Sequence, residues 1–217
     1  MDNYDNIDYQ KNKCYKLVSK LTPTSQYYIL KALKFAEKKH KGQNRISANL
    51  TPYVIHIYRV VLILLEEFKI SDPEVLSAAA LHDVIEDSGV TANELSIKFG
   101  KNIATMVKEE SQNLFPSRKT YMEHFKRAST KVKFIKISDR IDNLRTISHK
   151  TRFSDEKRAQ YVIESEKYIL PISKQASNVA QKKLQYLIKN LKANKKLSLL
   201  YKKLKARDKI GYQDTEK

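Results

Sequence analysis

Four ionisable residues lie within six positions of a stretch that is otherwise mainly apolar. The pair His82 and Asp83 is followed, three residues later, by the pair Glu86 and Asp87. The residues just before them, 78–81, are three alanines and a leucine, and they predict a buried helix. Charged groups buried without partners are costly, so these four are expected to be paired, exposed in a cleft or bound to a metal ion.

The spacing of these residues favours one shared site. His82 and Glu86 are four residues apart, as are Asp83 and Asp87, so a continuing helix would place each pair on one face. An imidazole beside carboxylates is a donor set for a divalent metal ion, and a further carboxylate pair can act on a water molecule. The alternative is a helix C-terminus followed by acidic surface residues, and this stretch alone does not distinguish the two.

Two other segments offer candidate partners. The helix expected over 52–68 is apolar almost all round and contains His56, where a satisfied core histidine is the commoner outcome. The helix expected over 130–148 carries Asp139 within its apolar face, with Asn143 one turn later on the same side. A carboxylate in that position needs a partner, and a metal ion would serve.

The elements that must position these residues are predicted to be helices. With 4 glycines, 5 prolines and a hydrophobic fraction of 41%, the 217-residue chain favours long helices and disfavours a β-sandwich. Periodicity and capping residues predict helices over 25–41, 52–68, 73–83, from Thr91 to near Gly100, from 101 to about 112, 117–128 and 130–148, one from Ser154 to near Pro171, and one long or two shorter basic helices over 172–206. Thr24 or Ser25 is expected to cap the first of these, and Thr51 to cap the second with Pro52 as its first residue.

The chain carries a formal net charge of +18, and its lysines are dense in residues 181–209. Such a charge predicts attraction to nucleic acid, to an anionic surface or to a highly phosphorylated small molecule, although a lysine-rich proteome would produce it without a function. The single cysteine, Cys14, excludes an intramolecular disulfide framework and fits a reducing compartment, so a cytoplasmic location is expected. The N-terminus is unlike a signal peptide, and no apolar stretch approaches membrane-spanning length.

Four ordered segments carry recognisable motifs. They read A-x-x-x-H-x-G-Q-x-R over residues 36–45, P-Y-x-x-H over 52–56, L-H-D-x-x-E-D over 81–87 and K-x-x-D-R-x-x-N-x-R over 136–145. This order resembles the HD-domain metal-dependent phosphohydrolases, especially the hydrolase domain of RelA/SpoT homologues and the stand-alone small alarmone hydrolases.

The resemblance implies an all-α, HD-domain helical bundle with a buried metal site. It also implies an enzyme that hydrolyses guanosine tetra- and pentaphosphate and releases the 3′-pyrophosphate. The implied cofactor is one Mn²⁺ ion, and the positions that match its ligands are His56, His82, Asp83 and Asp139.

The same resemblance assigns roles around that ion. Glu86 and Asp87 match the acidic pair that handles the attacking water, so they are the predicted catalytic residues. Arg45 matches an arginine that packs against the guanine base, Asn143 a residue of the nucleoside pocket and His40 a position in the site wall. Cationic side chains that could neutralise the polyanionic substrate are Lys41, Arg45 and Arg140.

The chain departs from the family pattern at several positions. Ile57 follows the first metal ligand where the family has proline, and residues 109–112 replace a Val-Thr-Lys stretch. Ile46 stands where a second basic residue is common, and Asp142 replaces a histidine or tyrosine. No predicted metal ligand is lost, but the last two departures leave the identity of the nucleotide open.

The resemblance divides the chain into a polar N-terminal lead-in over 1–22, a hydrolase domain over 23–170 and basic C-terminal helices over 171–217 that pack on the domain. Two alternatives remain open. One is an HD phosphohydrolase that acts on another nucleotide, for example by removing the 2′-phosphate of NADPH. The other is a non-enzymatic helical protein that binds nucleic acid through its basic C-terminal helices.

Overall fold

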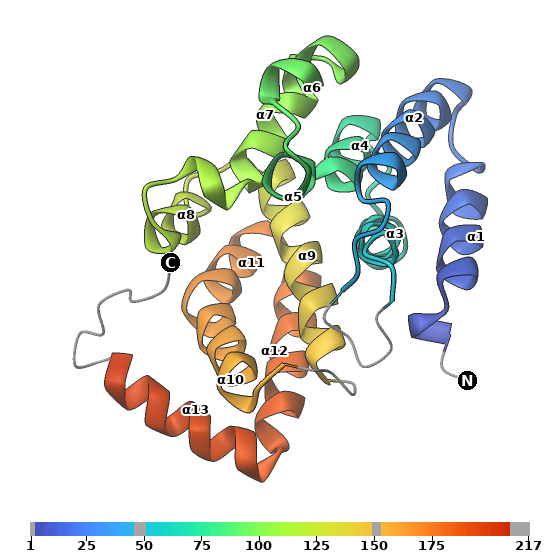
Figure 1. Cartoon of the computed structure of the whole chain (residues 1–217). Helices are drawn as coiled ribbons and strands as arrows, with labels where there is room; N and C mark the ends of the chain where they lie inside the picture. The colour runs from blue at the N-terminus through green and yellow to red at the C-terminus, as the bar shows by residue number, and fades with distance from the viewer. Residues whose placement is uncertain (1–2, 46–50, 149–152, 209–217) are drawn as a thin grey trace.

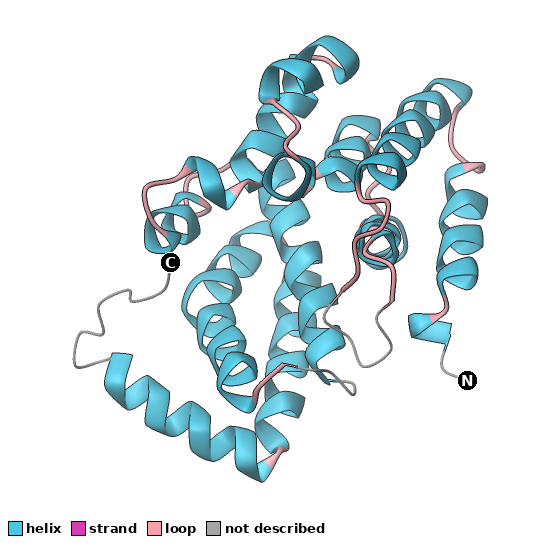
Figure 2. Cartoon of the chain, viewed as in Figure 1, coloured by secondary structure: helices cyan, strands magenta, loops and turns pink. Residues whose placement is uncertain are grey.

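The computed structural model describes residues 3–45, 51–148 and 153–208. Within these ranges the chain is a succession of helices joined by short loops (Figure 2), as its few glycines and prolines predict. The predicted all-α fold class is therefore confirmed. An isolated β-bridge pairs Asn44 with Pro52.

The helices follow one another along the whole described chain. They are α1 (Ile7–Val18), α2 (Pro23–Lys39), α3 (Val54–Leu62), α4 (Pro73–Leu81), α5 (Val84–Ser88), α6 (Ala92–Phe99), α7 (Lys101–Glu110), α8 (Arg118–His124), α9 (Thr130–Ser148), α10 (Asp155–Glu164), α11 (Leu170–Ala176), α12 (Asn178–Ala193) and α13 (Lys195–Asp208). Short 3-10 turns occur at Asn3–Asp5 and Gln112–Leu114, and π-helical turns at Ile63–Glu67 and Ser165–Ile169 extend α3 and α10.

The long helix α9 lies at the centre of the molecule (Figure 1). It packs against α3, α4 and α7 from the first half of the chain and against α10, α11 and α12 from the second half. Because neighbours surround it, apolar residues such as Ile137 and Ile141 alternate with buried charged residues such as Lys136 and Asp139. Buried charges need partners, so α9 is where a functional site is to be sought.

The helix that leads to the His-Asp pair is short and fully enclosed. α4 packs along α2 and against α3 and α7. Its start is well defined, because Oδ1 of Asp72 accepts from the backbone N–H of Glu74 at 2.9 Å and Pro73 occupies the first turn, where no N–H is required. The alanines 78–80 have no exposed surface and allow close packing. The C-terminal end of α4 is thereby held in place.

The start of α3 differs from the prediction. The sequence places the first helical residue at Pro52, but the helix begins at Val54. Pro52 pairs instead with Asn44, and the backbone N–H of Arg45 donates to Thr51 O at 2.9 Å. This extended pairing, which helix periodicity does not reveal, brings Arg45 back beside the first turn of α3.

Two further helix ends also differ. α2 is capped by Thr22 and not by Thr24 or Ser25, because the proline at position 23 takes the first helical position and the cap must precede it. The helix predicted to stop near Pro171 continues into α11, where this proline lies in the first turn after a wider π-helical turn.

The two ends of the chain pack against the central helices. α1 lies against α3 and buries Cys14 and Val18. The basic region forms two helices, α12 and α13, that separate at Asn194 and bury an apolar side. The three-part division of the chain stays a prediction, and residues 209–217 lie outside the described residues. In the described part of the chain, no helix combines the length and the apolar character needed to span a membrane.

Candidate metal centre and active site

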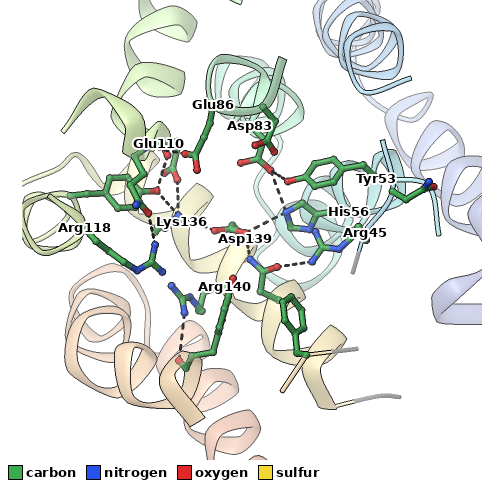
Figure 3. A pocket seen from close by; sticks show the side chains of 17 residues that line it. Arg45, Tyr53, His56, Asp83, Glu86, Glu110, Arg118, Lys136, Asp139 and Arg140 are labelled. Carbon is green, nitrogen blue, oxygen red and sulfur yellow. Dashed lines mark hydrogen bonds and ion pairs between the residues drawn. The ribbon is translucent and has the colours of Figure 1, made fainter. Parts of the chain in front are cut away.

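A cavity of about 330 Å³ lies beside the middle of α9 (Figure 3). It is reached by side chains from α3, from the α4–α5 junction, from α7 and from α9. Predicted site residues that line it are Arg45, His56, Asp83, Glu86, Asp87, Asp139, Arg140 and Asn143. Residues that are up to about a hundred positions apart in the sequence therefore meet at one place.

Two histidines and two aspartates gather at one end of this cavity. Nitrogen or oxygen atoms of His56, His82 and Asp139 all lie within 4.8 Å of one another. Nε2 of His56 is 3.4 Å from Oδ1 of Asp139 and 3.7 Å from Oδ2 of Asp83, and Nε2 of His82 is 2.8 Å from the same Asp83 oxygen. All four predicted metal ligands are thus brought together.

The hydrogen bonds of the two imidazoles show which nitrogen of each faces the cluster. Nδ1 of His56 lies 2.6 Å from a carboxylate oxygen of Asp142, and Nδ1 of His82 lies 2.8 Å from the backbone oxygen of Ala79. Both partners are acceptors, so each Nδ1 donates its proton outward and each Nε2 faces the cluster, where it can offer a lone pair to a metal ion. Nε2 of His82 is buried and lies 2.8 Å from Oδ2 of Asp83.

This arrangement fits a divalent metal ion. Two imidazole nitrogens and two carboxylates converge in the interior, a donor set that a divalent cation would neutralise and bind. Each histidine also donates its other nitrogen to an acceptor, as metal-ligating histidines usually do. The structure therefore supports a candidate divalent-metal site built from His56, His82, Asp83 and Asp139.

The pKa values of these groups reflect the same crowding. Burial disfavours the charged form of His82, but the Asp83 carboxylate outweighs it and raises the pKa of His82 to about 9. Burial alone would raise the pKa of Asp83 and of Asp139, yet His82 beside the first and Lys136 beside the second hold both well below their usual range. Both carboxylates are ionised at neutral pH and available as ligands.

The His-Asp pair does not continue its helix. α4 ends at Leu81, Asp83 adopts φ −100° and ψ −4°, and a separate short helix, α5, begins at Val84. The helix predicted over 73–83 thus ends two residues early, and His82 and Glu86 do not share one helix. Asp83 and Asp87 still span one helical turn, because the backbone N–H of Asp87 donates to Asp83 O at 2.9 Å. The break turns α5, so that Glu86 and Asp87 line the cavity together with Asp83.

The predicted catalytic carboxylates have distinct surroundings. Oε2 of Glu86 accepts from the backbone N–H of Gln112 at 2.9 Å. The backbone oxygen of Asp87 accepts from the side chain of Gln43 at 2.8 Å, which ties α5 to the loop that carries Arg45. Burial, reinforced by the Asp83 charge, raises the pKa of both carboxyl groups above the usual values. A raised pKa makes each carboxylate a stronger base, which favours proton abstraction from water.

Tyr53 is a site residue that the sequence analysis did not single out. Its hydroxyl donates to Oδ2 of Asp83 at 2.6 Å, and its ring lies 4.8 Å from the imidazole of His40 in a stacked arrangement. His40 is buried, bonds to Gln43 at 2.7 Å and does not line the cavity. Position 53 belongs to the P-Y-x-x-H motif, so its place in that motif was the available signal.

A second buried group on the cavity wall also escaped the sequence analysis. Nζ of Lys136 lies 2.9 Å from Oδ2 of Asp139, 2.6 Å from the Tyr121 hydroxyl and 3.6 Å from Oε2 of Glu110. Burial raises the pKa of Glu110 to about 8, against the opposing effect of Lys136. Lys136 therefore balances the charge of the metal-side carboxylates. Glu110 falls in the stretch noted as a departure from the family.

The opposite end of the cavity is cationic. Arg118 pairs with Glu164 through two nitrogens, at 2.6 and 2.7 Å, and also bonds to Gln112. Arg140 lies 3.4 Å from the same glutamate and packs over the ring of Tyr161. One carboxylate thus holds two guanidinium groups, which leaves the trio with a net positive charge. Both arginines line the cavity (Figure 3).

A polar chain links Arg45 to the metal cluster. Nη2 of Arg45 donates to Oδ1 of Asn143 at 2.6 Å, and the amide nitrogen of Asn143 donates to Oδ1 of Asp139. The guanidinium of Arg45 lies 5.6 Å from the ring centroid of Tyr53. The two predicted nucleoside-binding residues therefore stand side by side at the metal end of the cavity.

Other predicted positions lie away from the cavity. Lys41 is exposed in the turn after α2 and does not line the cavity, so its role stays a prediction, as does that of His40. Ile57 is completely buried in the core. Ile46 lies outside the described residues.

Asp142, a departure from the family pattern, is completely buried behind His56. Burial would raise its pKa, but Arg59 and His56 beside it hold that pKa well below the usual range. Arg59 is itself buried, with its Nε 2.7 Å from Oδ1 of Asp142. The hydroxyl of Tyr4 donates to the same oxygen at 2.7 Å. No local spacing pattern connects these residues, and the sequence analysis missed the group.

Comparison with known proteins gives consistent results. The family profile described as "HD domain" matches residues 32–167. The chain is 37% identical over 127 residues to the guanosine-3′,5′-bis(diphosphate) 3′-pyrophosphohydrolase MESH1 of Xenopus tropicalis, which covers 57% of this chain and 71% of that protein. It is 33% identical over 147 residues to the Drosophila melanogaster protein of the same name, covering 65% and 82%.

A solved structure shows the same fold. It is a metazoan ortholog of SpoT, described as hydrolysing ppGpp and acting in starvation responses. It superimposes with a TM-score of 0.69 at 29% sequence identity, over 75% of this chain and 94% of that one.

Proposed function

This chain belongs to the HD-domain family, and on that basis we propose that it hydrolyses guanosine tetra- and pentaphosphate at the 3′-pyrophosphate. The resemblance inferred from the four motifs is confirmed by the family match and by relatives that carry this activity in their names. The observation that carries the proposal is the cavity itself, where a His and Asp cluster, an acidic pair and a cationic wall face one another.

The proposed cofactor is one Mn²⁺ ion held by His56, His82, Asp83 and Asp139. Mixed imidazole and carboxylate donors suit such an ion. When bound, it supplies positive charge that polarises a phosphoryl group and makes water easier to deprotonate. Lys136 holds Oδ2 of Asp139 at 2.9 Å, and Tyr53 donates to Oδ2 of Asp83 at 2.6 Å, so that both carboxylates keep a fixed direction.

Glu86 and Asp87 are the proposed acid–base pair. Both line the cavity next to Asp83, and both have a raised pKa, so either can take a proton from water at neutral pH more readily than an ordinary surface carboxylate. Hydrolysis adds the elements of water across the 3′-phosphate ester, giving pyrophosphate and a nucleotide with a free 3′-hydroxyl.

The cationic wall is suited to a polyphosphate. Arg118 and Arg140 line the end of the cavity that lies away from the metal cluster, and their guanidinium groups can each donate two parallel hydrogen bonds to a phosphate. We assign them to the substrate's phosphates. Arg45 and Asn143, at the metal end, are proposed to hold the nucleoside.

The test is product identity with defined metal content. Purified protein loaded with Mn²⁺ is expected to convert ppGpp to GDP and pyrophosphate, and His82→Ala is expected to abolish both metal binding and turnover. His124→Gln is the matched control, since this histidine does not line the cavity. Normal turnover by His82→Ala would contradict the metal assignment.

A nucleotide panel tests the substrate. Guanosine tetraphosphate, guanosine pentaphosphate and NADPH are supplied separately, and NADPH would release orthophosphate in place of pyrophosphate. Preferred release of orthophosphate from NADPH would favour the alternative nucleotide hydrolase.

The single cysteine and the proposed nucleotide substrate also support a cytoplasmic location.

A further inference from the structure

The carboxylate of Asp142 stands directly behind a metal-binding imidazole. Its Oδ2 lies 2.6 Å from Nδ1 of His56, on the side of the ring opposite the cluster. Asp142 has no exposed surface and does not line the cavity, so it cannot touch substrate. Its contacts toward the cavity are His56, at 2.6 Å, and the guanidinium of Arg45, at the longer distance of 3.9 Å. The shorter contact, with His56, is its main route to the metal site.

Asp142 is held from other directions as well. Arg59, on α3, places Nε 2.7 Å from Oδ1 and donates from Nη2 to Oδ2 at 3.2 Å. The hydroxyl of Tyr4 donates to Oδ1 at 2.7 Å and to the backbone oxygen of Asp142 at 3.2 Å. The side chains of His56, Arg59 and Tyr4 together hold this carboxylate in a single orientation.

Tyr4 is in turn fixed by the residues it touches. Nη1 of Arg59 donates to the backbone oxygen of Tyr4 at 3.2 Å, and the guanidinium lies 4.1 Å from the Tyr4 ring centroid. The side chain of Gln10 donates to the backbone oxygens of Asn3 and Tyr4 at 2.9 and 3.3 Å. The N-terminal segment is thereby joined to the metal site, although it precedes the residues that match the family.

A carboxylate on the outer nitrogen of a metal-binding histidine acts in two ways. It fixes the tautomer and the plane of the ring, and it makes the inner nitrogen a stronger donor. Here the carboxylate's own charge is balanced by Arg59, so the pair is stable in the interior. His82, in contrast, has only a backbone oxygen behind it.

We propose that Asp142, Arg59 and Tyr4 form a support network that orients His56 and sets the affinity of the site for its divalent ion. These are positioning residues, because they act through His56. The proposal rests on the metal site of the proposed function but not on the identity of the nucleotide.

Metal affinity without substrate tests the support network. Mn²⁺ binding is measured by equilibrium dialysis on the full chain. Asp142→Asn keeps the size of the side chain and is expected to weaken Mn²⁺ binding about 10- to 100-fold, the usual effect of losing such a partner. Tyr4→Phe keeps the ring over Arg59, removes the hydroxyl that donates to Asp142 and is expected to weaken binding about fivefold.

The matched control is Tyr15→Phe. The Tyr15 hydroxyl donates to Oε1 of Glu37 at 2.8 Å, so this change also removes a tyrosine–carboxylate bond near the N-terminus, but away from the cavity. Its Mn²⁺ affinity is expected to equal that of the wild type. Co²⁺-loaded protein adds a spectroscopic measurement: the visible absorption bands should shift in Asp142→Asn and stay unchanged in Tyr15→Phe.

The outcomes separate this inference from the proposed function. Wild-type Mn²⁺ affinity and an unshifted Co²⁺ spectrum in Asp142→Asn would overturn the support network and leave the hydrolase proposal standing. If Asp142→Asn does not fold, the Mn²⁺ affinity of Tyr4→Phe tests the support network instead, because this variant keeps the buried charges of Asp142 and Arg59. Wild-type affinity in Tyr4→Phe would then overturn the network. If the wild-type protein binds Mn²⁺ but does not hydrolyse ppGpp, the proposed substrate is wrong, while the metal site and the support network are unaffected.

Discussion

Two strongly charged regions of this molecule use their charges differently. Around the cavity, Lys136, Asp139 and Asp142 are each less than 10% exposed, and each has a partner within 2.9 Å. On α12 and α13 the lysines lie mainly at the surface, and Lys196, whose side chain is 78% exposed, forms an ion pair with Asp155. The first region determines chemistry, whereas the second mainly determines net charge.

This difference shows why the net charge of +18 is a weak guide to function. A buried ion whose partner is removed costs about 3–5 kcal/mol, while an exposed pair contributes about 0–1 kcal/mol. Charges are tolerated in the interior only where several groups are arranged together. The buried charges, though far fewer than the exposed lysines, therefore mark the site.

The largest effect is expected at the acid–base pair. Glu86→Gln keeps the shape of the side chain but cannot accept a proton, so kcat should fall by about 10²- to 10⁴-fold. Metal content should stay the same, because Glu86 is not a proposed ligand. Steady-state kinetics with metal analysis checks this, and a decrease of less than about tenfold would contradict its role in proton transfer.

Replacing one lysine by methionine in each region tests the comparison directly. Lys136→Met leaves Asp139 and Glu110 without their buried cation and should lower the free energy of unfolding by about 3–5 kcal/mol. Lys202→Met on α13 replaces an exposed lysine and should change the free energy of unfolding by less than about 0.5 kcal/mol. Urea unfolding of both variants measures the difference; equal effects would remove the distinction between the regions.

Glu67 links the central helix α9 to the basic helix α12 and should show an intermediate effect. It pairs with Arg145 of α9 at 2.6 and 2.9 Å and with Lys183 of α12 at 2.9 Å. Burial raises the pKa of Glu67, but these cations outweigh it and hold that pKa below its usual value. Glu67→Gln should therefore lower stability by about 1.5–3 kcal/mol at pH 7.

The sign of the pH dependence follows from that lowered pKa. The contribution of Glu67 is fully present above its unfolded pKa, about 4.3, and is lost as the pH falls through the lower folded value. Unfolding measured between pH 7 and pH 3 should show the wild type losing more stability than Glu67→Gln. Parallel curves would mean that the carboxylate is not ion-paired in solution.

The smallest effect is expected from the exposed lysines. Replacing Lys195, Lys202 and Lys203 together by glutamine should leave kcat/KM for ppGpp nearly unchanged at physiological ionic strength, where the Debye length is about 8 Å. The same protein tests the nucleic-acid alternative. Salt-dependent duplex or RNA binding that is lost in the triple variant would support that alternative, while no binding by the wild type would remove it.

Much of the site could be predicted because its chemistry is local in sequence. His82 after an apolar run and Asp139 on an apolar helix face are charged or polar residues in buried positions, and such conflicts between residue type and position are visible without coordinates. The exposed acidic pair, Glu86 and Asp87, was found through its closeness in sequence to His82 and Asp83. Arg118 and Lys136 were not identified, because a cation among many lysines and arginines carries no local mark of burial.

The sequence alone determined that the protein is helical and predicted the side chains that could hold a metal ion, since helical periodicity and residue type are properties of neighbouring positions. Only the tertiary structure decided which partner stands behind each imidazole, how the break between α4 and α5 directs Glu86, and that Tyr4 reaches Asp142 across the fold. These outcomes depend on packing between helices that are distant in the chain, and burial gives each hydrogen bond its strength only after that packing has formed.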